Sequence, residues 1–133
     1  MKKYLLLTFS FCFFAFYFLK AQDTAAMQAD RTMYGIASFY SDKFNGRKTG
    51  SGEIFSQTKF TAASNRFSFG TWLKITNLRN NKTVYVRVND RMHPKMKRIV
   101  DLTRAAAQKI GMINAGITKV KVEVYGKTKP KEE

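Results

Sequence analysis

Hydrophobic and polar residues alternate along several stretches of the chain, which is the spacing of half-buried β-strands. The clearest stretch is Thr83–Asn89, where three valines would point to one face and Tyr85, Arg87 and Asn89 to the other. Lys119–Tyr125 repeats the pattern with three further valines on one face. The other strand predictions are Tyr34–Tyr40, Phe60–Ser64 and Trp72–Thr76.

One stretch has the pattern of a helix. Thr103–Ile110 begins with a residue that caps helices well, contains three alanines and is followed by Gly111, a common helix end. Asn77–Lys82 has the composition of a tight turn between two strands. Many short strands with one short helix predict an all-β fold, a closed barrel, and not a β-α-β sheet.

The first residues have the pattern of a secretory signal peptide. A basic Met1–Lys3 precedes the uncharged, Phe- and Leu-rich run Tyr4–Leu19, and Ala21 suits the last position before cleavage. An uncleaved membrane anchor is the alternative, but 16 residues are short for a bilayer. We therefore expect a signal peptide at 1–21, a linker at 22–33, one domain at 34–126 and a mobile charged tail at 127–133.

The charge of the chain favours acidic partners. Its 24 Lys and Arg outnumber 9 Asp and Glu, for a formal net charge of +15. Export and the lack of a nucleic-acid-binding motif argue against nucleic acid. Anionic envelope material remains: peptidoglycan, lipopolysaccharide or lipid headgroups. The alternative is that the charge only keeps the domain soluble.

Cysteine and histidine are too few to build a metal centre. Cys12 is the single cysteine and lies in the predicted signal peptide, and His93 is the single histidine. No set of ligands with metal spacing occurs, and no Gly-rich phosphate loop precedes a helix. We expect no disulfide, metal or cofactor, and a monomer that associates with the envelope without a transmembrane span.

Two carboxylates stand out in this basic chain. Val84–Asp101 holds two apolar runs, each predicted to end on an acid, Asp90 and Asp101. Carboxylates at strand ends are candidates for acid–base chemistry. The structural alternatives are that Asp101 caps the following helix and that Asp90 binds Arg91 or loop amides.

Several motifs in one order resemble the rare lipoprotein A (RlpA) family. They cover roughly Tyr34 to Gly126 and are, in order, Gly35-x-Ala37-Ser38-x-Tyr40, Phe44-x-Gly46-Arg47-x-Thr49-x-Ser51-Gly52-Glu53, Thr61-Ala62-Ala63, Phe69-Gly70-Thr71, Thr76-Asn77, Val88-Asn89-Asp90-Arg91, Asp101-Leu102-Thr103-Arg104-Ala105-Ala106-Ala107, Gly111-Met112 and the closing Val120–Val124 strand.

The resemblance implies a six-stranded double-psi β-barrel with one short helix, like that of expansins, exported to the bacterial periplasm or outer membrane. The activity it implies is endolytic lytic transglycosylation of peptidoglycan, favouring glycan strands stripped of stem peptides. Glu53 and Asp90 match two of the family's four functional positions, and Asp101 matches the acid of expansins and related transglycosylases. Ser56 and Ser64 stand where the family has an aspartate and a histidine.

Two functional hypotheses follow. In the first, the protein is a peptidoglycan lytic transglycosylase with catalytic Asp90, Glu53 and Asp101, and its substrate-binding residues are Arg47, Arg91, Tyr40 and Tyr85. In the second, it is a non-catalytic glycan-binding module with the basic rim Arg47, Lys48, Arg66, Arg91 and Arg104. Two alternatives concern single residues: Glu53 as the partner in a loop-ordering hydrogen bond, and His93 as a substitute proton carrier or an inert loop residue.

Overall fold

The computed structural model describes residues 31–131. The predicted signal peptide and all but the last three residues of the predicted linker lie outside this range. Within it, no helix combines the length and the apolar character needed to cross a membrane.

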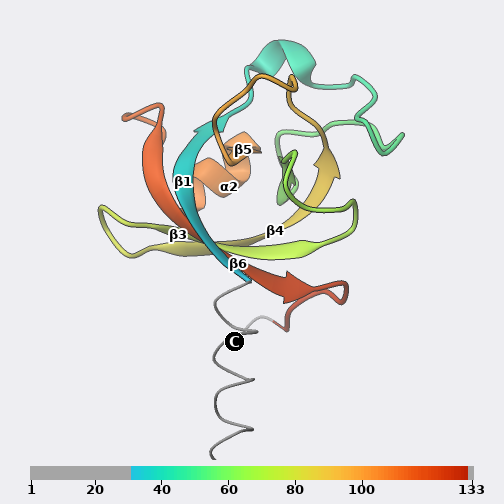
Figure 1. The fold of residues 1–133 in the computed structure, drawn as a ribbon. Coiled ribbons are helices and arrows are strands. Elements are labelled where there is room, and N and C mark those ends of the chain that lie inside the picture. Colours follow the sequence, from blue (N-terminus) through green and yellow to red (C-terminus); the bar gives the residue numbers. More distant parts are fainter. Residues whose placement is uncertain (1–30, 132–133) are drawn as a thin grey trace, which may run out of the picture. The chain divides into compact units, whose positions relative to one another are not determined.

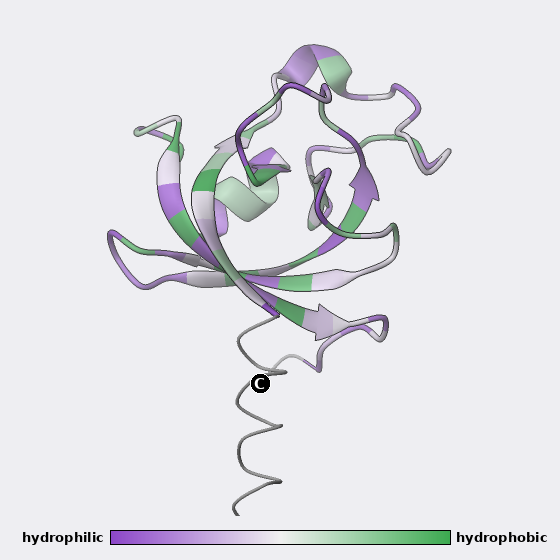
Figure 2. Ribbon diagram, viewed as in Figure 1, coloured by the Kyte–Doolittle hydropathy of each residue, from purple (hydrophilic) through white to green (hydrophobic). Residues whose placement is uncertain are grey.

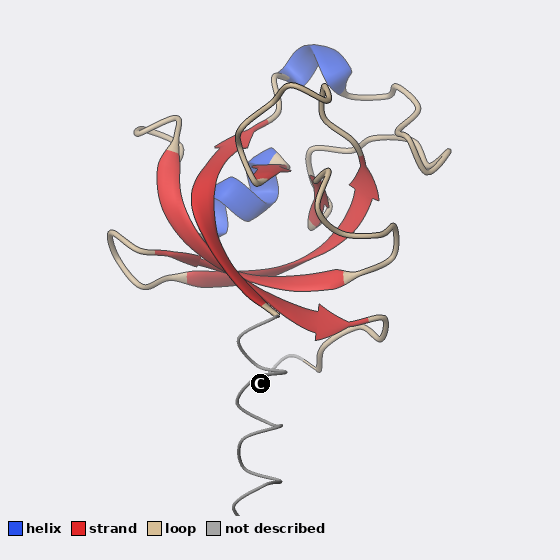
Figure 3. Cartoon of the chain, in the orientation of Figure 1, coloured by secondary structure: helices blue, strands red, loops and turns tan. Residues whose placement is uncertain are grey.

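Six strands close into a barrel (Figure 1, Figure 3). The strands are β1 (Thr32–Phe39), β2 (Thr61–Ala63), β3 (Trp72–Asn77), β4 (Thr83–Asp90), β5 (Val100–Leu102) and β6 (Thr118–Gly126). Their order around the barrel is β1-β5-β2-β4-β3-β6. The pairing is mixed, because β1 runs parallel to β5 and β2 parallel to β4, whereas the other neighbours are antiparallel.

The two helices are short. A 3-10 turn, η1 (Asp42–Phe44), follows β1, and α2 (Arg104–Lys109) follows β5. Thr103 caps α2 by accepting a hydrogen bond from the Ala106 amide, and Gly111, at φ +67°, follows its end in a conformation that glycine adopts without strain. The predicted helix and its caps are confirmed.

The buried apolar residues of the strands fill the barrel interior, and Figure 2 shows hydrophobic and hydrophilic residues alternating along the strands. Val84, Val86 and Val88 of β4 are buried, and they pack with Leu73, Ile75, Val120 and Val122 from the neighbouring strands. Burying each such side chain contributes about 1.5–3 kcal/mol to folding. The predicted inward faces of β4 and β6 are therefore confirmed, although Val124 is only half-buried.

A β-bulge breaks the alternation at the end of β4. Ala62 of β2 pairs with Val88 and Ala63 pairs with Asp90, so Asn89 is the extra residue. In a regular strand Asp90 would share the inward face of Val88. The bulge instead turns the end of β4 so that the Asp90 carboxylate meets the loops at this end of the barrel.

Four local predictions need correction. Strand β1 begins at Thr32, two residues before the predicted start, because it pairs with β6 from that point. Asn89 was expected on the outer face but is 3% exposed, since the loop that carries Glu53 covers it. Asp101 lies in the middle of β5, not at a strand end. The prediction of a mobile tail does not hold for its first residue, because Lys127 donates hydrogen bonds to oxygens of the loop at 68–71.

Candidate functional site

Asp90 accepts three hydrogen bonds at the end of β4. The backbone amides of Gly50 and Arg91 each donate to Oδ1 at 2.8 Å, and the Tyr40 hydroxyl donates to Oδ2 at 2.6 Å. Gly50 fits here because a Cβ at this position would lie 3.1 Å from the Phe69 ring and 3.3 Å from Oδ1. The prediction that Asp90 binds loop amides is thus confirmed. Asp90 also accepts a hydrogen bond from the phenol of Tyr40.

Tyr40 contributes its hydroxyl to the site, not a free ring face. Its ring packs against Phe55 at 4.3 Å and Phe44 at 5.7 Å between centroids. Burial raises the pKa of Tyr40 far above its usual value, and the hydrogen bond to Asp90 and the charges of Asp90 and Asp101 raise it further. Tyr40 therefore stays a protonated donor, and the stacking of its ring on sugars stays a prediction.

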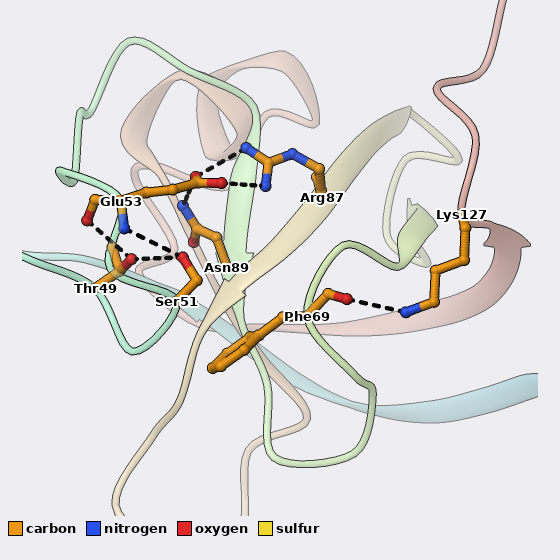
Figure 4. Close-up of polar contacts among 7 residues, drawn as sticks. All are labelled: Thr49, Ser51, Glu53, Phe69, Arg87, Asn89 and Lys127. Atoms are coloured by element: carbon orange, nitrogen blue, oxygen red, sulfur yellow. Dashed lines mark hydrogen bonds and ion pairs between the residues drawn. The ribbon is translucent and has the colours of Figure 1, made fainter.

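Glu53 is held by a guanidinium and an amide (Figure 4). Arg87 Nη1 and Nη2 donate to its two oxygens at 2.6 and 2.9 Å, and Asn89 Nδ2 donates to Oε2 at 3.1 Å. The hydrogen bond from Arg87 is the largest cause that lowers the pKa of Glu53 to about 2, and partial burial opposes it. Glu53 is therefore ionised near neutral pH and ties its loop to β4.

Asn89 joins the Glu53 loop to the bulge. Its backbone oxygen accepts from the Ser51 amide at 3.1 Å, while its Nδ2 donates to Glu53. Thr49 and Ser51, on the same loop, share a hydrogen bond of 3.0 Å between their hydroxyls. Asn89 Oδ1 is the one buried side-chain N or O atom in residues 31–131 without a partner. The bulge thus sets the position of Asp90, and it holds Glu53 through the Asn89 side-chain amide.

Asp101 forms a bidentate ion pair with Arg98. Arg98 Nε and Nη2 donate to its two oxygens at 2.8 and 3.1 Å, and the Asp101 side chain is 17% exposed. The interaction raises the pKa of Arg98. The alternative that Asp101 caps α2 is wrong, because the Thr103 hydroxyl fills that role.

The barrel places Asp90 and Asp101 on the two strands that flank β2. Ala63 pairs with Asp90 on one side and with Asp101 on the other. Two strand spacings separate their backbones by about 10 Å. The charges of both carboxylates act on Tyr40, so the structure brings these three residues together. No group of His, Cys, Asp and Glu among residues 31–131 has the arrangement of a metal site.

The two serines differ in what surrounds them. Ser56 is half-buried, and its hydroxyl shares a 2.9 Å hydrogen bond with that of Thr58. Ser64 is completely buried, donates to the Ile99 carbonyl at 2.8 Å and accepts from the Arg66 amide. The Ser64 amide also donates to the Asp90 carbonyl. Ser64 is therefore a structural part of the loop beside Asp90.

The other predicted binding residues are spread around this end of the barrel. Arg91 Nη1 donates to the carbonyls of Ser64 and Phe67, and its guanidinium lies 4.0 Å from the centre of the Phe69 ring. Arg47 is exposed, and its guanidinium lies 5.8 Å from the Phe44 ring.

Tyr85 and His93 contact residues other than Asp90. Tyr85 lies on the outer face of β4, beside Tyr125, with 5.5 Å between ring centroids. His93 Nδ1 accepts a hydrogen bond from the Lys95 amide, which gives it a place in its own loop turn. This contact favours the loop-residue interpretation of His93.

Several residues of the site were not predicted. Gly50, Arg87, Asn89 and Arg98 each contact one of the three carboxylates, yet none was assigned a role in the site. Arg98 precedes Asp101 by three residues, a spacing that hints at a local pair. The Glu53 contacts join residues 34 and 36 positions apart, so no local pattern reveals them.

The fold and its site define a double-psi β-barrel protein. In structure, the chain is similar to the apo expansin of Clavibacter michiganensis (TM-score 0.60, 24% identity, covering 74% of this chain and 52% of that one). It is also similar to a Streptomyces papain inhibitor (TM-score 0.57, 18% identity, covering 70% of this chain and 93% of that one). At these identities the likeness concerns the fold alone.

Residues 32–122 match the family described as lytic transglycolase, and the chain belongs to this RlpA-like family. It is 50% identical over 90 residues to the endolytic peptidoglycan transglycosylase RlpA of Pasteurella multocida, covering 68% of this chain and 31% of that protein. With the RlpA of Neisseria meningitidis serogroup A, the identity is 43% over 107 residues, covering 79% and 45%. The chain thus spans less than half the length of these relatives.

Proposed function

We propose that the protein cleaves peptidoglycan glycan strands by lytic transglycosylation, with Asp90 as the proton-transfer group. The names of the relatives support the reaction class. The observation that carries the assignment is that Glu53 and Asp101 are each bound by a guanidinium, whereas Asp90 has a phenol and two amides as partners. Of the three candidate carboxylates, only Asp90 exchanges a proton without breaking an ion pair.

The reaction balances with one carboxyl group and no water. Protonated Asp90 gives its proton to the glycosidic oxygen as the bond from muramic acid C1 to that oxygen breaks. The 6-hydroxyl oxygen of the same muramic acid then bonds to C1, and its proton returns to Asp90. The products are a 1,6-anhydro end and a new free sugar hydroxyl. Tyr40 fixes the orientation of Asp90 throughout, because its raised pKa keeps it a donor.

Glu53 and Asp101 act on the site without transferring protons. The pKa of Glu53, about 2, removes it as an acid near neutral pH. Its bonds to Arg87 and Asn89 hold the loop whose Gly50 amide contacts Asp90. Asp101 helps to keep Tyr40 a protonated donor, and its pair with Arg98 fixes its position.

The proposed function also requires export of the domain. The predicted signal peptide, with cleavage after Ala21, would bring the domain to the periplasm or the outer membrane, where its substrate lies. Cleavage removes Lys2, Lys3 and Lys20, and the remaining net charge of +12 (21 Lys and Arg against 9 Asp and Glu) favours association with glycan strands that carry muramic acid carboxylates.

A non-catalytic glycan-binding module is the second candidate function. It is favoured by Ser56 and Ser64, since a hydroxyl does not replace a carboxylate or an imidazole in proton transfer near neutral pH. In that case, Asp90 and the arginines at this end of the barrel would only bind the sugar.

Mass analysis of denuded glycan strands, after incubation with the full chain, separates the two functions. The enzyme produces new 1,6-anhydro ends, which Asp90→Asn abolishes and Asp101→Asn reduces. Strands that bind but gain no such ends between pH 5 and 8 would exclude the enzyme and leave the binding module.

A further inference from the structure

A hollow of about 360 Å³, partly lined by Arg87, lies on the outer face of β3 and β4. Trp72 and Tyr85 point outward on these strands, and Phe60 adds a third ring. Trp72 lies opposite Arg87 in the β3–β4 pairing, and Lys74 lies opposite Tyr85. Regular alternation on two paired strands therefore produces an aromatic floor, which we call the outer groove.

Lysines surround this floor. Lys59, Lys109 and Lys129 line the hollow, and an adjoining hollow adds Lys74 and Lys131. Among residues 31–131, no Asp or Glu lines either hollow. The one acid opposite Lys74 on β6 is Glu123, which pairs with Lys121 at 3.4 Å. Among the described residues, the outer groove thus joins apolar ring faces to an excess of positive charge, a combination that suits an anionic ligand with flat apolar faces.

The tail builds one wall of the outer groove. Lys127 Nζ donates to Ser68 Oγ at 2.6 Å and to the Phe69 carbonyl and Thr71 Oγ1 at 2.9 Å each. This anchor places Pro130, which is buried, and Lys129 against the floor. The wall is thus held by hydrogen bonds.

The outer groove is linked to the Asp90 site through Arg87. Arg87 lines it and also binds Glu53, whose loop supplies the Gly50 amide to Asp90. Because Glu53 offsets the charge of Arg87, the excess positive charge of the groove resides on its lysines, of which Lys59 also interacts with Glu53. A linear ligand that reaches Asp90 and passes the Glu53–Arg87 pair would run onto Tyr85 and Trp72.

We propose that the outer groove is a second binding site, for a carboxylate-bearing glycan. The C–H faces of its sugar rings would lie on Trp72 and Tyr85, and its carboxylates would meet Lys59 and Lys109. The inference rests on the proposed function, because it makes the ligand a continuation of the strand cleaved at Asp90. The site prefers the acidic strand to its neutral counterpart.

Trp72 is the single tryptophan of the chain, so its fluorescence reports occupation of the outer groove. The full chain is titrated with denuded glycan strands and, separately, with chitin oligosaccharides of equal length, which share the backbone but lack the carboxylates. We expect the strands to shift the emission and to bind at least about tenfold more tightly than chitin. Equal affinity for the two, or a response only to anionic phospholipid vesicles or polyphosphate, would overturn the proposal.

Variants locate the binding. Lys59 and Lys109 are exposed, so Lys59→Gln with Lys109→Gln should fold and weaken strand binding about tenfold. Lys82→Gln with Lys119→Gln removes the same charge from exposed positions outside the groove and should leave affinity within about twofold. Equal weakening by both pairs would overturn the proposal, because it would mean nonspecific attraction.

The same samples are analysed for 1,6-anhydro ends, which separates the two claims. Groove-dependent binding without new ends supports the outer groove and contradicts the proposed reaction. New ends, with strand affinity unchanged by the Lys59 and Lys109 substitutions, support the reaction and contradict the outer groove.

Discussion

The Tyr40 hydroxyl donates a 2.6 Å hydrogen bond to Asp90 Oδ2, across 50 positions of sequence. The raised pKa of Tyr40 means that this bond persists through the working pH range. Tyr40→Phe should therefore lower the rate of glycan cleavage about 10- to 100-fold, the equivalent of one hydrogen bond to a charged group. Tyr34→Phe, at a ring 67% exposed, is the control and should leave the rate unchanged. An unchanged rate in Tyr40→Phe would show that Asp90 needs no orienting donor.

The Glu53–Arg87 pair predicts a pH-dependent part of the stability. The folded pKa of Glu53, about 2, lies below the usual 4.5, so the ionised form is favoured by folding. The contribution is complete above about pH 4.5 and is lost as the pH falls toward 2. Because the Glu53 side chain is 42% exposed, solvent screening limits it to about 1 kcal/mol.

Urea unfolding of the wild type and of Glu53→Gln at several pH values measures this contribution. The difference in the free energy of unfolding should be constant near pH 7 and shrink below pH 4.5. Glu123→Gln, which removes one carboxylate from the outer face of β6, controls for the change in net charge. A difference that does not depend on pH would contradict the lowered pKa.

Lys127 should stabilise the loop that carries Phe69. Its three oxygen partners lie in Ser68–Thr71, and the Phe69 ring packs on Arg91 beside Asp90. Lys127→Met should destabilise the fold by about 1–2 kcal/mol and speed amide exchange at Gly70 and Thr71. Lys119→Met, at an exposed lysine of β6, should change neither. Unchanged exchange in Lys127→Met would mean that the tail does not hold this loop.

Ser64→His should cost stability and should not raise the activity. The Ser64 side chain is fully buried and makes two hydrogen bonds, so an imidazole would overpack the loop beside Asp90, at about 1–3 kcal/mol. Ser56→Asp, at a half-buried position, should be tolerated. Thermal unfolding of both variants checks this. A Ser64→His variant as stable as the wild type and more active would contradict it.

The regular parts of the fold could be predicted from local patterns. Alternating valines identified β4 and β6, and Thr103 with Gly111 identified α2 and both its ends. These signals are local, because an alternating strand exposes one face and a capped helix satisfies its own first amides. The closed barrel also followed from the many short strands, whereas their number, six, came from the family resemblance.

The geometry of the site depends on a bulge and on contacts between residues far apart in the sequence, which a local pattern does not reveal. A one-residue bulge at Asn89 leaves the alternation of the valines intact, so the pattern placed Asn89 outside and missed the turning of Asp90. Arg87 looked like an ordinary outward residue, since its partner Glu53 is 34 residues away. Lys127 belonged to a charged tail with no periodicity, yet its three acceptors come from a loop 56 to 59 positions earlier.

Incubation of denuded glycan strands in ¹⁸O-labelled water tests the central claim most directly. If Asp90 passes the muramic acid's own proton and no water enters, mass spectrometry will find new 1,6-anhydro ends without the label, and Asp90→Asn will produce none. Labelled reducing ends would contradict the claim, because water would then be the nucleophile. Equal numbers of anhydro ends from wild type and Asp90→Asn would contradict the role of Asp90.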